Sequence, residues 1–407
     1  MKEAILLGAL GQVGSGEAGA IFRGFIHDAV RSSFIDVMLK EVEMLCGPSY
    51  RPFIGNQPYR SGSAPGVCIL EGCSERVVRP RVRRKTAGGS EEMRLESYNV
   101  AQNADAVKET ILRALMAGVS GRDQKRLYPE SPLTSKSSVS RLWAKEGAKK
   151  IEVLRGRELS GEVFFGLMLD GIYLSGDLTA IVAIGMTCDG RKIVLDFQVG
   201  SSENREVCDD LLNRLVRRGF KPVARLFSVL DGSDALKASV LAHYPDAVTQ
   251  RCLIHKERNI RACLSKRHYG ELFEYFKRLR NTQGAETGKE IYKELREFLA
   301  SKNLKALKSF EEAGEDIIAL HLINAPATLN VSLLSTNFIE NSFRNVRAKI
   351  GRVKRWRAET EQAERWLAYG LLEAERGFKR MKGWQEIPLL VEKLKKKPEL
   401  LPHEKTA

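Results

Sequence analysis

The stretch that decides the fold runs from residue 161 to residue 259 and contains GEVFFGLMLDG (161–171), RLFSVLDGSDALKA (225–238) and AVTQRCLIHKERN (247–259). Asp170 and Asp231 each close an apolar run, and each is followed by glycine. Apolar runs of this length predict buried strands, and a following glycine predicts a sharp turn. The pattern therefore predicts two carboxylates at the ends of buried strands, which is a suitable place for an active site.

The same stretch predicts a recognisable order of strands and helices. Three apolar runs rich in Val, Ile and Phe, at 162–170, 178–187 and 191–199, are separated by short turns and predict an antiparallel meander. The elements predicted to follow are a helix, a strand, a helix, a strand and a helix, at 203–218, 225–231, 233–244, 247–255 and from Lys256 onward. This βββαβαβα order predicts an α/β fold with a ribonuclease H-like core. In that topology the first and fourth strands are neighbours, so Asp170 and Asp231 should meet at one edge of the sheet.

Glu340 is the predicted third carboxylate of the site. It lies in LLSTNFIENSFRNVRAKIGRVKRWR (333–357), a predicted helix capped by Ser335 or Thr336. Adjacent carboxylates repel one another unless a cation lies between them, and oxygen ligands favour Mg²⁺ or Mn²⁺. Three acids could hold two such ions about 3.5–4 Å apart and act on a phosphodiester. Each acid also has a structural explanation, because LDG is a common strand-end turn and an early helical Glu stabilises the helix dipole.

Basic and amide side chains accompany the three acids. The residues predicted to contact DNA around the site are Arg251, Lys256, Arg258, Asn337, Asn341, Arg344 and Arg347. Cys252 and His255 form a Cys-x-x-His pair, which is half of a zinc site without a second half at a suitable spacing. His255 is therefore predicted either to contact DNA or to position a carboxylate, and a buried structural role for the pair is the alternative.

Length and charge bound the class of protein. A chain of 407 residues should divide into two to four domains. Lys and Arg number 66 against 51 Asp and Glu, which gives a net charge of +15. The charge is spread in clusters along the chain and not on one amphipathic helix, so nucleic acid is favoured over a membrane surface as the partner. Seven cysteines with irregular spacing indicate reduced thiols in a cytoplasmic protein.

The N-terminal part is predicted to handle DNA. Residues 1–20 should form a flexible leader, and residues 21–98 one or two helices (Ile21–Cys46) followed by a small β-hairpin. Basic residues crowd the second half of the hairpin and would suit DNA phosphates, or would equally keep a sheet edge soluble. These residues are Arg76, Arg79, Arg81, Arg83, Arg84 and Lys85.

Residues 99–150 predict a helix-turn-helix-like domain, with one helix at 103–117 and a second that begins near Ser135. Ser137, Ser138 and Arg141 would lie on the exposed face of the second helix, as in a recognition helix. An ordinary polar helix pair is the alternative.

The remaining boundaries follow from the change of pattern. Residues 151–268 should form the first part of the core, 269–330 an all-helical insertion, and 331–390 the helices that complete the core. The C-terminal helix is predicted as one amphipathic segment over 358–387, and residues 391–407 as a basic tail without order.

Four blocks resemble, in this order, the signature blocks of Mutator-type transposases and their bacterial insertion-sequence relatives. The blocks are LMLDG (167–171), LDGSDAL (230–236), QRCLIHKERN (250–259) and STNFIENSFRNVR (335–347). The resemblance extends over roughly residues 20–390 and is looser in the N-terminal region. It implies an Asp-Asp-Glu transposase whose core carries an all-helical insertion between Asp231 and Glu340. It also implies that the Cys-x-x-His block lies beside the active site.

The leading hypothesis is metal-dependent cleavage at the terminal inverted repeats of a mobile element, followed by strand transfer into target DNA. Two element ends must be brought together, so at least a homodimer is expected. The protein should be cytoplasmic and associated with the nucleoid, without a membrane partner. The alternatives are a domesticated or inactive relative that only binds DNA, and a ribonuclease H-like nuclease that has no transfer step.

Overall fold

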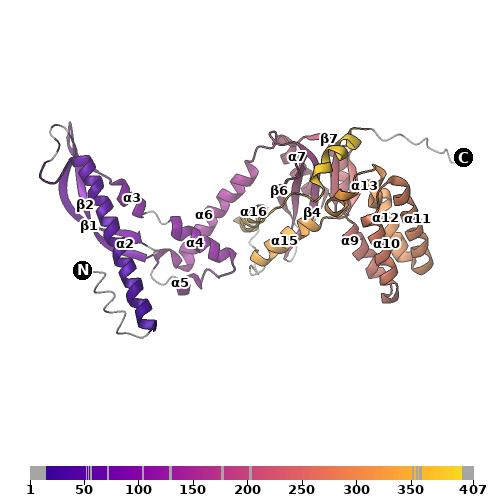
Figure 1. Ribbon diagram of the computed structural model, residues 1–407, viewed down its shortest axis with the longest axis horizontal. Coiled ribbons are helices and arrows are strands. Elements are labelled where there is room, and N and C mark those ends of the chain that lie inside the picture. Colours follow the sequence, from indigo (N-terminus) through magenta and orange to yellow (C-terminus); the bar gives the residue numbers. More distant parts are fainter. Residues whose placement is uncertain are drawn as a thin grey trace. The chain divides into compact units, whose positions relative to one another are not determined.

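The computed structural model describes residues 15–51, 53, 55, 57–70, 73–102, 105–127, 131–175, 178–200, 204–350, 353, 356 and 360–396. The chain forms two compact units, residues 1–143 and 144–407. Helix α6 (Lys136–Arg155) crosses the boundary between them (Figure 1). Within the described ranges, no helix is long and apolar enough to cross a membrane.

The first unit contains a small antiparallel sheet that packs against a long helix, α2 (Ser15–Cys46). The strands pair in the order β1-β2-β3 and span Tyr59–Leu70, Cys73–Thr86 and Gly89–Met93. Met38 and Val42 of α2 form an apolar cluster with Val82 of β2. The predicted hairpin is confirmed as β1 and β2. Strand β3 is not apparent from the sequence, because GSEEM has no β-branched residue.

Helix α2 begins earlier than the predicted end of the leader. Residues 15–20 form its first turns, so the prediction of a flexible leader is wrong for them. Ala18, Ala20 and Glu17 favour a helix and no proline interrupts it, so the helix extends through the two glycines of this stretch. The predicted leader residues 1–14 lie outside the described residues.

Short helices complete the first unit. They are α3 (Glu96–Gln102), α4 (Asp105–Met116), α5 (Gln124–Leu127) and the 3₁₀ turn η1 (Pro132–Thr134). The two helices predicted for residues 99–150 are confirmed as α4 and α6. Helix α6 continues to Arg155, past the predicted domain boundary at residue 150.

The second unit is built on a mixed five-stranded sheet with the order β6-β5-β4-β7-β8. The strands span Phe164–Ser175 (β4), Leu178–Thr187 (β5), Lys192–Gly200 (β6), Pro222–Leu230 (β7) and Val248–Arg251 (β8). Strands β4, β5 and β6 form an antiparallel meander, while β7 and β8 run parallel to β4. The predicted neighbourhood of the first and fourth core strands, β4 and β7, is confirmed.

Two apolar clusters place helices on the two faces of this sheet (Figure 1). Leu167 and Leu169 of β4 pack with α7 (Arg205–Arg217) and α8 (Asp234–His243). The intervening Met168 belongs to the other cluster, which includes α9 (Leu253–Cys263), α15 (Asn337–Ile350), α16 (Gln362–Glu375) and α17 (Ile387–Lys395). Strand side chains alternate between faces, so Asp170 lies on the same face as α9 and α15.

The predicted insertion is confirmed as helical, because no strand occurs between Cys252 and Ile350, a segment that is described throughout. Helices α10, α11 and α12 pack on one another and on α9 (Figure 1). The elements of this segment are η2 (Lys266–His268), α10 (Tyr269–Asn281), α11 (Ala285–Lys302), α12 (Leu304–Ala313), η3 (Gly314–Ile318), α13 (Ala319–Leu322), η4 (Ala327–Leu329) and α14 (Asn330–Leu333).

Two predicted strand ends are wrong. Strand β4 continues past Asp170 to Ser175, because Asp170 and Gly171 still pair with Val182 and Ile181 of β5. Strand β8 ends at Arg251, and Leu253 and His255 belong to α9 and not to a strand. The backbone N–H of Leu253 donates to the carbonyl of Leu334 in this first turn, which fixes the start of α9.

The C-terminal prediction of one long helix followed by a tail is also wrong. Helix α16 ends at Glu375, and a 3₁₀ turn, η6 (Trp384–Glu386), leads into α17. The predicted tail from residue 391 is helical as far as Lys395, because Leu394 is buried against the core and its carbonyl accepts a hydrogen bond from Arg225 Nε. Residues 397–407 lie outside the described residues.

Candidate active site

Asp170 and Asp231 come together through the pairing of β4 with β7. Leu169 and Leu230 are the last paired residues of this parallel ladder, and each Asp directly follows one of them. After Asp231 the chain turns at Gly232, whose φ is +118°, and Asp231 Oδ1 accepts a hydrogen bond from the backbone N–H of Ser233. The predicted turn after the second aspartate is therefore present.

Asp170 is almost fully buried, and one of its oxygens has no protein partner. Its Oδ1 accepts a hydrogen bond from the N–H of Gly171 at 2.9 Å, whereas its Oδ2 is buried without a hydrogen bond. Burial raises the pKa of this carboxyl well above its ordinary value, and the charge of Asp231 raises it further. An unpaired buried carboxylate oxygen beside a second carboxylate is costly unless a cation or proton joins them.

Glu340 lies in the first turn of α15, where its backbone N–H donates to the carbonyl of Thr336. Its carboxylate forms an ion pair with His255 Nε2, and Arg258 Nη1 lies 3.7 Å from the same oxygen. The charge of Glu340 also contributes to the raised pKa of Asp170, as the last of several causes. Glu340 therefore belongs to the same site, with His255 as its direct partner.

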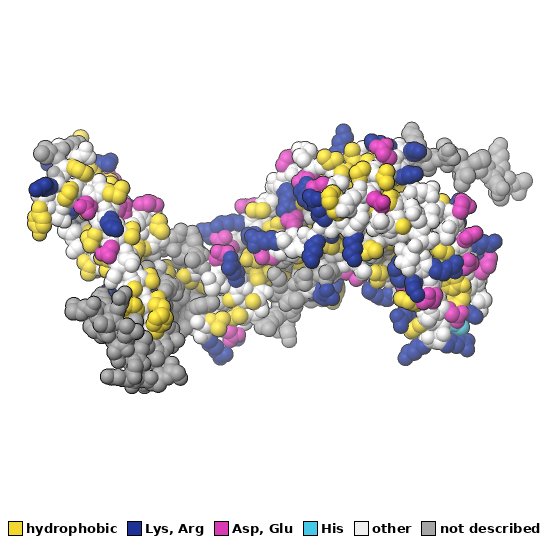
Figure 2. All heavy atoms as spheres, in the orientation of Figure 1, with side chains coloured by type: hydrophobic (Ala, Val, Ile, Leu, Met, Phe, Trp, Pro, Cys, Tyr) yellow, Lys and Arg dark blue, Asp and Glu magenta, His cyan; other side chains and the backbone are white. Residues whose placement is uncertain are grey.

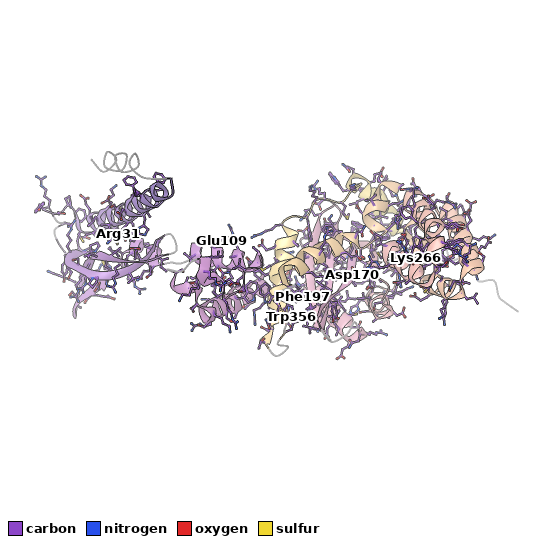
Figure 3. The ribbon with its side chains drawn as sticks, turned by 90° about the horizontal axis from the view of Figure 1, so that it is seen from below. Arg31, Glu109, Asp170, Phe197, Lys266 and Trp356 are labelled. Atoms are coloured by element: carbon purple, nitrogen blue, oxygen red, sulfur yellow. The ribbon has the colours of Figure 1, made fainter. Side chains whose placement is uncertain are left out.

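One pocket of about 700 Å³ contains these groups. It is lined by Asp170, Gly171, His255, Arg258, Asn337, Glu340, Phe343, Arg344 and Arg347. In Figure 3, Asp170 and Phe197 are labelled in the region of the sheet, and Lys266 on the helical insertion. The pocket thus combines acidic side chains from β4 and α15 with basic ones from α9 and α15, which suits a polyanionic substrate that needs cations at its reacting group.

Cys252 connects the start of α9 to the start of α15. Its buried sulfur lies 3.3 Å from both the N–H and the hydroxyl of Thr336. Burial opposes ionisation of this thiol, but interactions with His255 and Thr336 outweigh burial and lower its pKa. The same Cys252 interaction is the largest cause that raises the pKa of His255 to about 9. Glu340 is thus the direct partner of the imidazole at Nε2, whereas Nδ1 is buried without a hydrogen bond.

The residues present fit a divalent cation in part. Within the described part of the chain, no three His, Cys, Asp or Glu side chains form a ready metal-binding group. The unpaired oxygen of Asp170, the neighbouring Asp231 and the absence of thiolate or imidazole from this pair match the oxygen ligands that Mg²⁺ and Mn²⁺ prefer. Glu340 supplies a further carboxylate oxygen, which in this structure is paired with His255.

The other predicted contact residues differ in their surroundings. Arg258, Asn337, Arg344 and Arg347 line the pocket. The side chain of Asn341 lies outside the described part of the structure. Ser137 and Arg141 lie on α6, which precedes the core strands in the sequence, and both are exposed. Ser138 donates its backbone N–H to the hydroxyl of Ser135 at the start of that helix. Their predicted contacts with DNA stay predictions.

The structure does not support the predicted DNA contacts of Lys256 and Arg251. The Lys256 side chain is fully buried, and its ammonium bonds to Glu312 and to the carbonyl of Ser309 in α12. Arg251 lies 3.1 Å from Glu312 and donates to the carbonyl of Gly232. Both cations therefore attach the helical insertion to the core, because Glu312 pairs with both of them.

Two residues of this region are not apparent as functional from the sequence. The sequence predicts Thr336 only as a possible helix cap, whereas in the structure it bonds to Cys252. Glu312 lies in an ordinary amphipathic helix and gives no local signal of its pairing with Lys256. The only indication in the sequence is that Thr336 is polar and lies shortly before Glu340.

The fold and the site together define a mixed α/β protein with a group of acids in a basic pocket. The family model described as Transposase, Mutator family, matches residues 4–380. The chain therefore belongs to the Mutator family of transposases.

Curated relatives are transposases of insertion sequence elements. The chain is 28% identical over 256 residues to the transposase for insertion sequence element IS1201 of Lactobacillus helveticus, with 60% of this chain and 67% of that protein covered. It is 25% identical over 331 residues to the transposase for IS905 of Lactococcus lactis, with 78% and 81% covered. It is 28% identical over 221 residues to the transposase for IS6120 of Mycolicibacterium smegmatis, with 53% and 67% covered.

Proposed function

We propose that this protein is an Asp-Asp-Glu transposase that cleaves DNA at the inverted repeats of an insertion sequence and joins the cut ends to target DNA. The observation that carries the proposal is the buried, unpartnered Oδ2 of Asp170 beside Asp231, in the pocket that also contains Glu340 and three arginines. The sheet order and the parallel β4–β7 pair support a ribonuclease H-like core. Membership of the transposase family supports the DNA substrate.

In this proposal Asp170, Asp231 and Glu340 would hold two Mg²⁺ or Mn²⁺ ions, which would supply Lewis acidity for phosphoryl transfer. Water attacks the phosphorus at the element end, and the bond to the 3′ oxygen breaks, leaving a 3′-hydroxyl and a 5′-phosphate. The 3′-hydroxyl then attacks a target phosphodiester, forms the new bond and releases a target 3′-hydroxyl. Arg258, Arg344 and Arg347 bind the phosphates that flank the reacting one.

His255 acts as a positioning residue for Glu340 in this proposal. The imidazole Nε2 bonds to the carboxylate, and the bonds from Thr336 to Cys252 fix the start of α9, which carries His255, against the start of α15, which carries Glu340. Such partners fix the direction in which a ligand points. Glu340 is thereby kept in the lining of the pocket that contains Asp170.

The DNA partner and the assembly follow from the reaction. Double-stranded DNA enters as element ends and as target, and joining two ends needs at least a homodimer. The N-terminal unit, with exposed Ser137 and Arg141 on α6, is proposed to bind the ends. A nuclease without a transfer step remains the second candidate, because the same acids would serve hydrolysis alone.

The test uses the purified full chain, Mg²⁺, and oligonucleotides that carry the element ends found beside its coding region. Wild-type protein should cut these ends and join a pre-cut end to a second duplex. Asp170→Asn should bind the same DNA without cutting it. Normal cutting by that variant would refute the assignment of the site, and cutting without joining would favour the nuclease.

A further inference from the structure

A second pocket in the same unit has a different charge pattern from the acidic site. It has a volume of about 470 Å³ and lies between the segment after α6, the start of β6 and the end of α16. Five cationic side chains and three glutamates line it. The cations are Arg157, Arg191, Lys192, Lys379 and Arg380.

The three glutamates of this pocket are already bound by protein groups. Glu375 accepts two hydrogen bonds from Arg157 and one from the backbone N–H of Val194. Glu162 is paired with Arg191. Glu158 accepts a hydrogen bond from the backbone N–H of Ser160. Glu375 and Glu162 therefore neutralise the two arginines, and the three remaining cations of the pocket outnumber its one remaining glutamate, Glu158.

Lys192, Lys379 and Arg380 form no ion pair with an acid among the residues that the structure describes. Lys379 and Arg380 are exposed at the rim. Lys192 is half-buried, its Nζ lies 3.6 Å from the centre of the Phe338 ring, and burial lowers its pKa to about 8. A desolvated ammonium without a carboxylate partner is best stabilised by an anion that enters the pocket.

Phe338 joins this pocket to the acidic site. It follows Asn337, which lines the first pocket, and it lies in the turn of α15 that carries Glu340. Its ring also packs edge-to-face on Phe378, which lines the second pocket. The first turn of α15 thus lies between the two pockets, and a DNA strand that passes this turn would meet both.

We propose that Lys192, Lys379 and Arg380 form a second phosphate-binding site, which holds the backbone of the bound DNA at a distance from the reacting phosphate. This inference rests on the proposed function for its ligand, since DNA is the polyanion that the acidic site would act on. Figure 2 shows Lys and Arg side chains spread over the visible face of this unit, as expected for a surface that contacts DNA at several points.

The double variant Lys379→Ala/Arg380→Ala tests the proposal in the full chain. Each lost phosphate contact should reduce the slope of log affinity against log salt by about one, so the double variant should lose about two on a mixed-sequence duplex. The matched control is Lys393→Ala/Lys396→Ala, which removes two exposed charges outside both pockets and should keep the wild-type slope. An unchanged slope in the first variant would overturn the proposal.

A second measurement does not depend on a variant. Amine acylation of the wild-type chain, followed by mass spectrometry, should show Lys192 protected severalfold by the duplex. Inorganic phosphate distinguishes the source of the anion: if phosphate raises the melting temperature of wild type but not of Lys379→Ala/Arg380→Ala, and the salt slopes are equal, the site binds free phosphate and the DNA assignment fails. Cleavage by Asp170→Asn is scored separately, so failure of this site and failure of the proposed function give different results.

Discussion

Asp170 in β4 and Asp231 just after β7 occupy equivalent positions, each directly following one of the last paired residues of the parallel ladder, Leu169 and Leu230. The two strands differ beyond this point, because β4 continues to Ser175 while β7 ends and the chain turns at Gly232. Asp170 is therefore fixed by strand pairing with β5, and Asp231 is fixed by a turn. The sheet therefore presents the Asp170 carboxylate from a paired strand and the Asp231 carboxylate from a turn, at the same edge.

Asp170→Asn should reduce DNA cleavage by more than about a hundredfold, because changes to residues that merely support metal ligands already cost about 10–100-fold. Binding of the duplex should remain, since the fold keeps an amide of the same shape at this position. Asp246→Asn, at an exposed turn, is the matched control and should cleave normally. Cleavage assays run alongside gel-shift binding separate the two effects.

Divalent cations should stabilise the wild-type protein more than they stabilise Asp170→Asn. Without a cation, the unpaired Oδ2 and the neighbouring Asp231 charge oppose folding. Bound Mg²⁺ or Mn²⁺ should raise the melting temperature by mass action, and a chelator should reverse the rise. Equal melting shifts for both proteins would mean that the ions bind elsewhere.

His255→Ala should lower cleavage by about 10–100-fold if His255 positions Glu340. It should not change the salt dependence of DNA binding, because a positioning residue does not contact a phosphate. The alternative, direct contact of His255 with DNA, predicts a fall in the salt slope of about one. Measuring the slope for this variant therefore decides between the two roles.

Lys256→Met should lower the free energy of unfolding by about 1–3 kcal/mol, because it leaves the carbonyl of Ser309 without its donor and removes one partner of Glu312. Its DNA affinity and salt slope should match wild type, since the side chain is fully buried. Denaturant titration and binding assays check the two parts. A clearly reduced slope of log affinity against log salt would instead indicate that Lys256 contacts DNA.

His321 should make the helical insertion sensitive to acid. It is buried, its Nε2 lies 2.9 Å from the carbonyl of Leu279, and burial lowers its pKa. The folded state therefore favours the neutral ring. This stability contribution is complete above the unfolded pKa of about 6.5 and is lost as pH falls through the lowered folded value. His321→Gln should reduce the fall in melting temperature between about pH 7 and about pH 5.

Much of the second unit could be predicted from local patterns. The alternation and length of the apolar runs placed β4 to β7, and the polar amphipathic pattern after residue 269 predicted the helical insertion. Boundaries were less predictable because they depend on partners. Asp170 and Gly171 stay in a strand because β5 pairs with them, and His255 enters a helix because Leu253 bonds to Leu334, which is distant in sequence.

By itself, the sequence determined which residues could form the candidate site, because two Asp-Gly pairs after apolar runs and a Glu at the start of a basic helix are local patterns. It also determined the family, through four blocks in a fixed order. Only the tertiary structure decided which charged side chains line the pocket and which are buried in ion pairs within the protein. Arg258 and Lys256 are two residues apart on α9, yet one lines the pocket and the other is buried against Glu312. The reason is that the packing of α12 against α9, which no local pattern encodes, determines which face of α9 stays accessible.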